Sequence, residues 1–377
     1  MTTPTLVPRA TELSLTDTAQ ALVAGDKGLL AIDESTGTCN KRFAPLGIAQ
    51  DEQTRRAYRE LILTTPGLGD CISGAILCDE TIRQHTRGGV AFLTVLARAG
   101  ILAGIKVDLG AKPMAGHPGE QVTEGLDGLR ERLTEYAGMG VRFAKWRAVF
   151  TIGDSTPSRA CIEANAHALA RYTALCQDTG LLPVVEPEVL MTGDHTLGRC
   201  AQVTEEVLHE VFAQLHTQGI ELEGMLLKPN MVLPGLTCPT QVSADEVADA
   251  TTTCLRRAAP AAVAGIAFLS GGQSGDLASS RLAAMNSPAN AHLPWPLAFS
   301  FGRAIQQPAL TIWDGRDTNV EPAQEALLQR VRSNRDARRG DDGQLRRSRS
   351  PVGAGGAGKP ASTRPGDVHV LRAEEGV

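Results

Sequence analysis

The segment MLLKPNMV (residues 225–232) has the composition of a short buried strand that carries one charge, Lys228. Seven more apolar runs of similar length recur along the chain. Short, mainly apolar runs of this kind are typical of strands that are buried on both faces. In chain order the eight runs are GLLAID (28–33), ISGAIL (72–77), ILAGIKVD (101–108), RFAKWRAVF (142–150), LLPVVEPEVL (181–190), MLLKPNMV (225–232), GIAFLS (265–270) and PLAFSF (296–301).

Amphipathic helical patterns lie between these runs, and several of them end at glycine, as helices often do. The clearest patterns cover residues 51–65, 166–180, 204–219 and 244–259. Alternation of strand and helix implies parallel strands, and eight such units predict an α/β protein built as a (β/α)8 TIM barrel. An open, doubly wound sheet is the alternative, but no GxGxxG motif follows the first strand to support it.

The chain changes in composition near residue 334. Beyond that point it is rich in Arg, Gly, Ser and Pro and contains no aromatic residue. Such a composition cannot bury enough apolar surface to offset the entropy that ordering would cost. We therefore expect a single barrel domain over residues 1–334 and a disordered, flexible tail over residues 335–377.

Composition excludes several classes of protein. The chain of 377 residues is 42% hydrophobic, which suits a globular protein, and no apolar stretch approaches the roughly 20 residues that cross a bilayer. The first residues lack the features of a signal or transit peptide, so we expect a cytoplasmic protein without membrane contact. A net charge of −5 gives no reason to expect nucleic acid as the main partner.

Neither a disulfide framework nor a metal site is indicated. The eight cysteines are scattered without a CxxC pair, and in a large cytosolic chain we interpret them as reduced and mostly structural. The eight histidines are equally dispersed, without an HExxH motif. We therefore expect no bound metal and no other cofactor.

Charged residues gather where five of the predicted strands end. Active sites of (β/α)8 barrels lie at this carboxyl end of the strands. Four strands carry polar residues two positions apart, a spacing that places both side chains on one face. The residues are Asp33 after the first run, Lys106 and Asp108, Lys145 and Arg147, Glu186 and Glu188, and Lys228 and Asn230.

A set of structural ion pairs is the simpler interpretation of this cluster. Burying so many charges costs much desolvation energy and contributes little net stability, which makes a purely structural role harder to sustain across five strands. The prolines in EPE (186–188) and KPN (228–230) cannot donate a ladder hydrogen bond, so we expect both strands to end there.

A lysine among other charges in an apolar strand has a specific chemical use. An amine must be neutral to attack a carbonyl, and burial together with a nearby positive charge favours the neutral form. Lys145 could supply that charge for Lys228. The iminium that Lys228 would form is an electron sink for cleavage of a neighbouring carbon–carbon bond. Glu186 and Glu188 are candidates for the required proton transfers.

Two further parts of the sequence are suited to binding anions. LSGGQSG (269–275) and SFGRA (300–304) follow the seventh and eighth strands, where barrels commonly hold a phosphate; they offer Ser270, Gly271, Gly272, Ser300, Gly302 and Arg303. DESTGTCNKR (33–42) and the third and fourth strands offer Ser35, Thr38, Lys41, Arg42, Lys106 and Arg147. Two anion sites on either side of a Schiff-base lysine fit a phosphorylated sugar, specifically a bisphosphorylated ketose.

These motifs together resemble the class I fructose-1,6-bisphosphate aldolases over about residues 10–335. The resemblance rests on LLAIDESTG, NKRF, IKVD, TEGLDGL, FAKWR, VVEPEVL, GDH, LLKPNMV, LRRAAPAAVAGIAFLSGGQS and FSFGRA. It implies a lyase of glycolysis and gluconeogenesis that cleaves fructose 1,6-bisphosphate reversibly to dihydroxyacetone phosphate and glyceraldehyde 3-phosphate. It also implies a lysine Schiff base, no metal, and a homotetramer.

The resemblance also implies roles for particular residues. Lys228 would be the nucleophile, Glu186 the acid and base of iminium formation, and Asp33 the base that takes the proton of the C4 hydroxyl. Lys145 and Glu188 would tune Lys228 and its protons. The C6-phosphate side would be Arg147, Lys106, Ser35, Thr38, Lys41 and Arg42, and the C1-phosphate side Ser270, Gly271, Gly272, Ser300, Gly302 and Arg303.

The C-terminal region departs from the family. Its members usually end in a flexible tail whose last residue is a tyrosine that helps proton exchange on the enamine. Here the sequence ends in EEGV, and its last tyrosine is Tyr172.

Two other functions fit parts of the pattern. A transaldolase-like or deoxyribose-phosphate aldolase reaction would use the same barrel and lysine, but the second phosphate cluster argues against it. A scaffold whose Arg-rich tail binds acidic partners is the alternative outside catalysis. The presence of every expected type of catalytic residue argues against that role as the main one.

Overall fold

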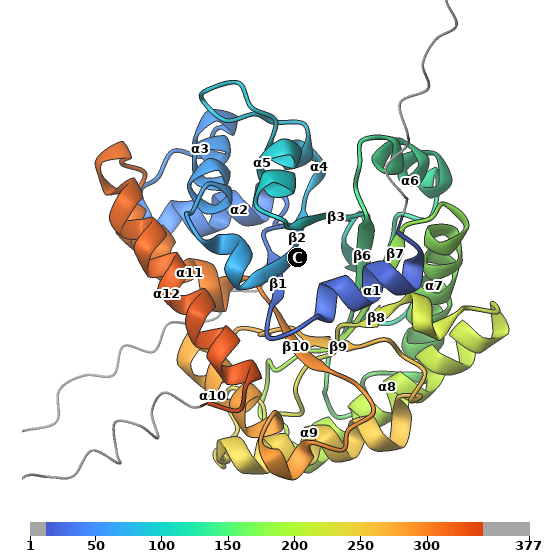
Figure 1. Cartoon of the computed structure of the whole chain (residues 1–377). Coiled ribbons are helices and arrows are strands. Elements are labelled where there is room, and N and C mark those ends of the chain that lie inside the picture. The colour runs from blue at the N-terminus through green and yellow to red at the C-terminus, as the bar shows by residue number, and fades with distance from the viewer. Residues whose placement is uncertain (1–12, 342–377) are drawn as a thin grey trace, which may run out of the picture.

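Eight parallel strands hydrogen-bond side by side and close into a barrel in the computed structural model, which describes residues 13–341 (Figure 1). Their order around the barrel is β1-β10-β9-β8-β7-β6-β3-β2. Each of the eight predicted runs forms one strand, so the predicted (β/α)8 barrel is confirmed. The strands are β1 (Gly28–Ala31), β2 (Ile72–Leu77), β3 (Leu102–Lys106), β6 (Phe143–Phe150), β7 (Leu182–Val189), β8 (Leu226–Leu227), β9 (Ile266–Phe268) and β10 (Leu297–Phe301).

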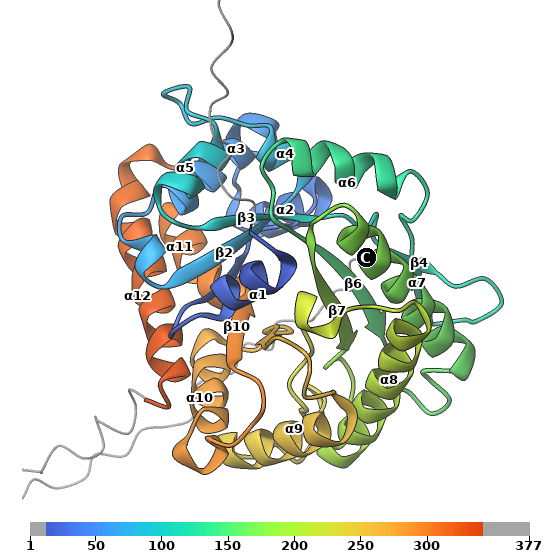
Figure 2. The ribbon, with the colours of Figure 1, turned by 45° about the vertical axis from the view of Figure 1, so that its right-hand side comes forward.

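Helices surround the barrel, and the ring that they form is visible in Figure 2. A short antiparallel hairpin, β4 (Ala111–Pro113) with β5 (Gln121–Thr123), follows β3 and was not indicated by the sequence patterns. The helices are α1 (Leu15–Val23), α2 (Thr36–Phe43), α3 (Glu52–Leu63), α4 (Asp79–Ile82), α5 (Phe92–Arg98), α6 (Leu129–Gly138), α7 (Arg159–Asp178), α8 (Leu197–Thr217), α9 (Ala244–Ala258), α10 (Gly275–Met285), α11 (Arg303–Trp313) and α12 (Val320–Arg338).

The inner face of the strands changes from apolar to charged along the barrel axis. On β6, Phe143 is buried in an apolar cluster at the amino end, whereas Lys145, two residues later on the same face, belongs to a cluster of charges. On β7, Val184 likewise precedes Glu186. Because inward residues recur every second position, β6 and β7 each carry one apolar and one charged level. The carboxyl ends of the strands therefore hold the polar centre.

The amino end of the barrel is filled and covered. Helix α1 places Leu22 in the same apolar cluster as Phe143. The ring of Phe143 takes the space beside β3, since a Cβ on Gly104 would lie only 2.2 Å from one of its ring carbons. Among residues 13–341, this packing closes the amino end of the barrel. Substrate must therefore approach from the carboxyl ends of the strands.

Helices α7 and α8 begin about seven residues earlier than their apolar patterns indicated. Ser158 caps α7, with its hydroxyl accepting from Cys161 N, and Thr196 caps α8 in the same way through Arg199 N. Such caps satisfy N–H groups that lack a partner within the helix. Both helices therefore start at a capping hydroxyl rather than at the first apolar residue.

The two proline-containing strand ends behave differently. β8 ends at Leu227, directly before Lys228 and Pro229, as expected. β7 runs to Val189 through Pro187, so the expectation that it ends at EPE was wrong. Leu182 N donates to Arg142 O and Leu190 N donates to Phe150 O, so the even-numbered backbone nitrogens of β7 point toward β6. Successive nitrogens alternate in direction, and the nitrogen of Pro187 therefore points toward β8. β8 has already ended there, so the missing N–H breaks no ladder bond.

The predicted boundary between barrel and tail also needs correction. Helix α12 extends to Arg338, so the first residues of the predicted tail 335–377 are helical and the 334/335 boundary lies inside a helix. The guanidinium of Arg338 donates to Leu297 O at 3.1 Å, to Val23 O at 3.0 Å and to Lys27 O. These contacts fasten α12 to α1, β1 and β10. The rest of the predicted tail, residues 342–377, lies outside the described residues.

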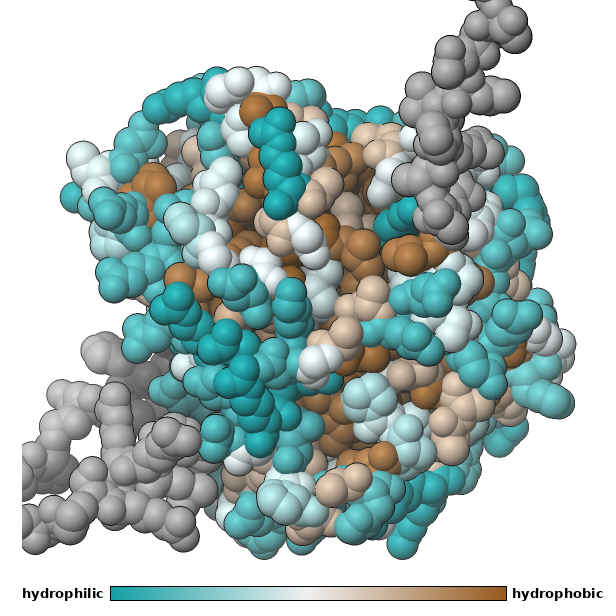
Figure 3. Space-filling model, in the orientation of Figure 1, coloured by the Kyte–Doolittle hydropathy of each residue, from teal (hydrophilic) through white to brown (hydrophobic). Residues whose placement is uncertain are grey.

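The surface and the cysteines agree with the sequence interpretation. In the view of Figure 3, hydrophilic residues predominate on the periphery, and apolar residues show mainly in recesses. All eight cysteine thiols are free; seven are buried, and Cys78 is half-buried. Within residues 13–341, no helix is both long and apolar enough to span a bilayer.

Arg338→Ala should lower the free energy of unfolding, because it leaves three backbone carbonyls at the base of the barrel without their charged donor. A loss of about 1–3 kcal/mol is expected. Arg332→Ala, at an exposed position of the same helix, is the matched control and should change the stability little. Urea denaturation of the two variants measures the difference, and equal stability would contradict the anchoring role of Arg338.

Candidate active site

The five predicted catalytic residues meet at the carboxyl ends of their strands. Glu186 lies on β7 and bridges two lysines: its Oε1 is 3.1 Å from Lys228 Nζ, and its Oε2 is 3.1 Å from Lys145 Nζ. All three side chains are at most 5% exposed. One buried carboxylate thus lies between two amines that come from the neighbouring strands β6 and β8.

Asp33 lies on the other side of Lys145, directly after β1. Its Oδ2 is 2.7 Å from Lys145 Nζ. Burial alone would raise the pKa of the Asp33 carboxyl, but the charges of Lys145 and Lys228 outweigh it and hold that pKa well below its usual range. Asp33 is therefore ionised at neutral pH.

Lys145 is held in its charged form. Burial favours the neutral amine, but Asp33, Glu186 and Asp108 together outweigh burial and raise the pKa of Lys145 above its ordinary value. Because it is a permanent cation, Lys145 orients the two carboxylates that flank it. The positive charge that was predicted near Lys228 is thus the ammonium of Lys145, which contacts the other oxygen of the Glu186 carboxylate.

Asp108 is a member of this centre that the sequence interpretation did not assign a role. Its side chain is 2% exposed, and its Oδ1 is 2.6 Å from Lys106 Nζ. Its Oδ2 accepts from Arg147 N at 3.1 Å and lies 4.0 Å from Lys145 Nζ. Asp108 therefore joins β3 to β6. The spacing of two residues in IKVD was the signal that could have identified it.

The second carboxylate of β7, Glu188, faces the mouth of the barrel. Its Oε2 accepts from Arg147 Nε at 2.6 Å. A Cβ on Gly271 would lie 3.8 Å from Glu188 Oε1, so the glycine loop after β9 passes close beside this carboxylate. Arg147 and the predicted C1-phosphate loop are thus linked through Glu188.

The loops after β9 and β10 converge as predicted. Gly271 and Gly272 have φ angles of +56° and +96°, a left-handed geometry that presents backbone N–H groups and that other residues rarely adopt. A Cβ on Gly272 would lie 3.1 Å from a guanidinium nitrogen of Arg303. Ser300 Oγ is buried without a hydrogen-bond partner. Gly302 caps α11, and Ser270 precedes the two glycines.

The comparisons with known proteins agree on one family. A family model of class-I fructose-bisphosphate aldolase matches residues 14–350. A probable fructose-bisphosphate aldolase class 1 of Xanthomonas campestris is 56% identical over 321 residues, which cover 85% of this chain and 96% of that protein. A cytosolic fructose-bisphosphate aldolase of Arabidopsis thaliana is 49% identical, over 86% of this chain and 90% of its own length.

A solved structure gives the same result. It is the fructose-bisphosphate aldolase of Plasmodium falciparum, in a ternary crystal with TRAP and a small-molecule inhibitor. It aligns with a TM-score of 0.85 and 44% identity, over 89% of this chain and 97% of that one.

The chain belongs to the class-I fructose-bisphosphate aldolases. It is a carbon–carbon lyase that acts on phosphorylated sugars and cleaves fructose 1,6-bisphosphate reversibly to dihydroxyacetone phosphate and glyceraldehyde 3-phosphate. Class I implies a lysine Schiff base and no metal. The resemblance and the function inferred from the sequence are thereby confirmed, and the role of each site residue stays a proposal.

In this aldolase a cavity of about 450 Å³ borders the charged centre on the side of β1, β2 and β3. Asp33, Ser35 and Lys106 line it together with residues of α4 and α6. Ser35 caps α2 and shares a hydrogen bond of 3.1 Å with Thr38 Oγ1, and Lys41 is exposed on the same helix. The cavity thus adjoins two of the residues predicted for the C6-phosphate side, Ser35 and Lys106.

Arg42 is oriented differently from the expected C6-phosphate contact. Its guanidinium pairs with Glu34 and donates to Gln306 Oε1 at 3.0 Å, and Gln306 belongs to α11. The Arg42 side chain is only 10% exposed. It therefore lies toward the helix that begins at Arg303, on the side of the predicted C1-phosphate loops.

Lys145→Met should lower stability by roughly 3–5 kcal/mol at pH 8, because it leaves buried carboxylates without their ammonium. The loss should be smaller at pH 5. In the wild type Asp33 stays ionised over this range, whereas in the variant burial raises the pKa of Asp33, which then takes up a proton and loses its unfavourable charge. The raised pKa of Lys145 keeps its own contribution constant between pH 5 and 8.

Urea unfolding of wild type and variant at both pH values measures this effect. A difference in stability that is the same at pH 5 and pH 8, or larger at pH 5, would contradict the electrostatic account.

Proposed function

We propose that Lys228 is the amine that forms the Schiff base with the C2 carbonyl of fructose 1,6-bisphosphate. The observation that carries this proposal is the buried contact of 3.1 Å between Lys228 Nζ and Glu186 Oε1. Lys228 is 3% exposed and directly follows β8, at the centre of the barrel mouth. Lys145, by contrast, is held as a cation by three carboxylates, so it is unsuited to nucleophilic attack.

Glu186 would transfer the protons of Schiff-base formation. It lies close enough to take a proton from the Lys228 ammonium, which frees the lone pair that attacks C2. The protonated Glu186 then donates to the hydroxyl of the carbinolamine, which leaves as water and gives the iminium. Lys145, on the other carboxylate oxygen, fixes the orientation of Glu186 during both transfers.

Asp33 would be the base of carbon–carbon cleavage. Its depressed pKa keeps it ionised, so it can accept the proton of the C4 hydroxyl as the C3–C4 bond breaks. The bonding electrons pass into the iminium and form an enamine, and glyceraldehyde 3-phosphate leaves as the aldehyde. Protonation of the enamine at C3 and addition of water then release dihydroxyacetone phosphate and restore Lys228.

The two phosphates would lie at opposite sides of this centre. The C1-phosphate would be held by the converging loops after β9 and β10, and the buried Ser300 hydroxyl supports this placement because it has no protein partner. The residues of that site are Ser270, Gly271, Gly272, Ser300, Gly302 and Arg303. The C6-phosphate side would use Ser35 and Lys106, which line the cavity beside β1 and β3, together with Thr38, Lys41 and Arg147. Arg42 would act on the C1 side instead, where it lies against α11.

We also infer that the enzyme is a cytoplasmic homotetramer. The family implies the tetramer, and two Arabidopsis relatives are named cytosolic. Light scattering after gel filtration should give the mass of four 39.8 kDa chains, and a monomeric mass at micromolar concentration would contradict the tetramer.

Lys228→Arg should abolish cleavage of fructose 1,6-bisphosphate while the protein folds normally, because a guanidinium does not deprotonate at neutral pH. In the wild type, borohydride reduction in the presence of dihydroxyacetone phosphate should attach the label to the peptide that contains Lys228. Mass mapping of the trapped protein tests this. A label on Lys145 or Lys106 would overturn the assignment.

Arg303→Ala should raise KM for fructose 1,6-bisphosphate, because it removes a charge-assisted contact to a dianion. Such contacts contribute about 1.5–3 kcal/mol, which corresponds to roughly ten- to hundredfold in KM. Arg316→Ala, at an exposed arginine beyond α11, is the control and should leave KM unchanged. Steady-state kinetics of both variants measure the two KM values. Equal values would contradict a C1-phosphate site at Arg303.

A further inference from the structure

The backbone ladder between β7 and β8 stops at the nucleophile. Lys228 N donates to Val185 O at 2.8 Å, and the next residue, Pro229, has no N–H. On β7 the backbone nitrogens that point toward β8 belong to every second residue: Val185, Pro187 and Val189. Since Pro187 also lacks an N–H, Val189 carries the next donor on that side and faces a strand that has already ended.

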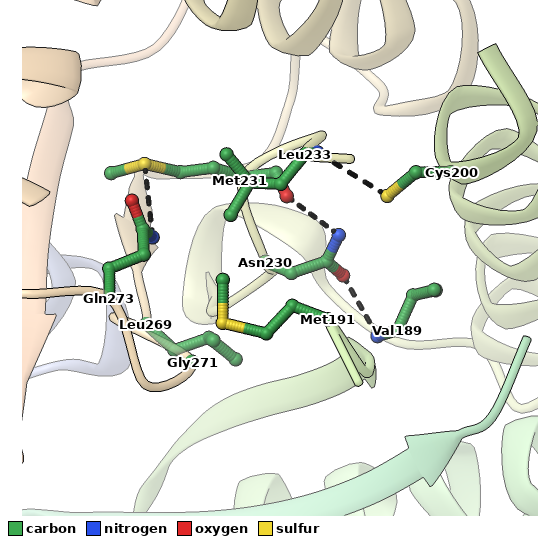
Figure 4. Close-up of a pocket in the computed structure, with 9 residues that line it drawn as sticks. All are labelled: Val189, Met191, Cys200, Asn230, Met231, Leu233, Leu269, Gly271 and Gln273. Carbon is green, nitrogen blue, oxygen red and sulfur yellow. Dashed lines mark hydrogen bonds between the residues drawn. The ribbon is translucent and has the colours of Figure 1, made fainter. Parts of the chain in front are cut away.

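The side chain of Asn230 replaces the missing ladder partner. Its Oδ1 accepts from Val189 N at 2.9 Å, as Figure 4 shows. Its Nδ2 donates to Met231 O at 3.1 Å and to Thr204 Oγ1 of α8 at 3.2 Å. Because Val189 N can only donate, the amide oxygen must face β7, so the orientation of the amide is determined. The residue is 6% exposed.

Two hydrogen bonds therefore bracket the catalytic segment of β7. The first, from Lys228 N to Val185 O, precedes Glu186, and the second, from Val189 N to Asn230 Oδ1, follows Glu188. The first is a backbone bond that persists in any variant with a normal strand. The second depends on one side chain.

We propose that Asn230 is a positioning residue that sets the distance between Lys228 Nζ and Glu186 by fastening the loop after Lys228 to the end of β7. The proposal rests on the assignment of Lys228 and Glu186 as nucleophile and proton carrier. A proton passes between them only at hydrogen-bond distance, and displacement by about 1 Å can cost on the order of a hundredfold in rate. The side chain of Asn230 is hydrogen-bonded to Val189, Met231 and Thr204, and not to Lys228 or Glu186.

The packing behind Asn230 makes this control stiff. A cavity of only about 10 Å³ lies beside Asn230, Met191 and Met231 (Figure 4). It has room for at most one water molecule. Gln273, from the glycine loop after β9, donates to Met231 Sδ at 3.6 Å and is in turn held by Arg281 at 2.8 Å. A shift of Asn230 would therefore be transmitted to its neighbours rather than absorbed by free space.

The test compares two substitutions of nearly the same shape. Asn230→Leu removes the acceptor for Val189 N, whereas Asn230→Asp keeps an acceptor oxygen there. In Asn230→Leu we expect kcat to fall about 30- to 100-fold, with KM for fructose 1,6-bisphosphate within about threefold, since the hydrogen-bond partners of Asn230 are Val189, Met231 and Thr204 rather than residues of the phosphate loops. The rate of iminium formation, followed by borohydride trapping with dihydroxyacetone phosphate, should fall in parallel. Asn230→Asp should retain kcat within about fivefold.

Two controls separate positioning from general stability. Ser73→Ala removes a buried hydroxyl that donates to Leu22 O and Gly28 O at the opposite end of the barrel, and should lower the melting temperature without changing kcat. Thr204→Val removes one partner of the Asn230 amide but leaves the bond to Val189, so kcat should stay within about twofold. This variant tests the proposal even if Asn230→Leu fails to fold.

The outcomes are distinct. A kcat within threefold of wild type in folded Asn230→Leu, an equal fall in the Leu and Asp variants, or a tenfold fall in Thr204→Val would each overturn the positioning role. Trapping on a lysine other than Lys228 in the wild type would instead overturn the catalytic assignment on which it rests.

Discussion

One carboxylate, that of Glu186, is shared by two lysines with different tasks, and the rest of the site follows from keeping those lysines apart. Lys145 and Lys228 come from strands on either side of β7, and each contacts a different oxygen of Glu186 at 3.1 Å. Of these two lysines, Lys145 alone also forms ion pairs with Asp33 and Asp108. The asymmetry of these partners makes one amine a fixed cation and leaves the other with a single carboxylate. Without Glu186 between them, two buried ammonium groups would repel each other at the centre of the barrel.

The barrel can hold this cluster because its two ends differ. Phe143 and Leu22 fill the amino end with apolar side chains that pack closely enough to require glycine at position 104. The favourable free energy of that burial offsets the cost of desolvating charges at the other end. The polar centre is thereby confined to a short section of the inner surface, where each charge finds a partner of opposite sign.

Features that depend on local composition could be predicted from the sequence. Each of the eight apolar runs became a strand, and the charged residues at their ends were correctly expected to meet, because strands that alternate with helices share one carboxyl end.

Features that depend on partners distant in sequence could not be predicted. The consequence of Pro187 depends on where β8 ends, and the contact of Arg42 depends on Gln306, 264 residues away. Asp108 was visible in IKVD, but its importance became clear only from its contacts with Lys106 and Arg147 N. The start of α7 at Arg159 was missed because a single capping serine carries less signal than an apolar stripe.

The contacts of Arg338 bring the two ends of the described chain together at the base of the closed barrel. Around the barrel β1 lies between β2 and β10, so the first strand pairs with the last. Arg338, near the end of the last helix, donates to Val23 O at the end of the first helix. The contact between the first and the last strand is therefore equivalent to the contacts between strands that the chain connects directly. The barrel therefore does not require the chain to begin and end where it does. A circular permutation that opens an exposed loop elsewhere should preserve the strand pairs of the barrel.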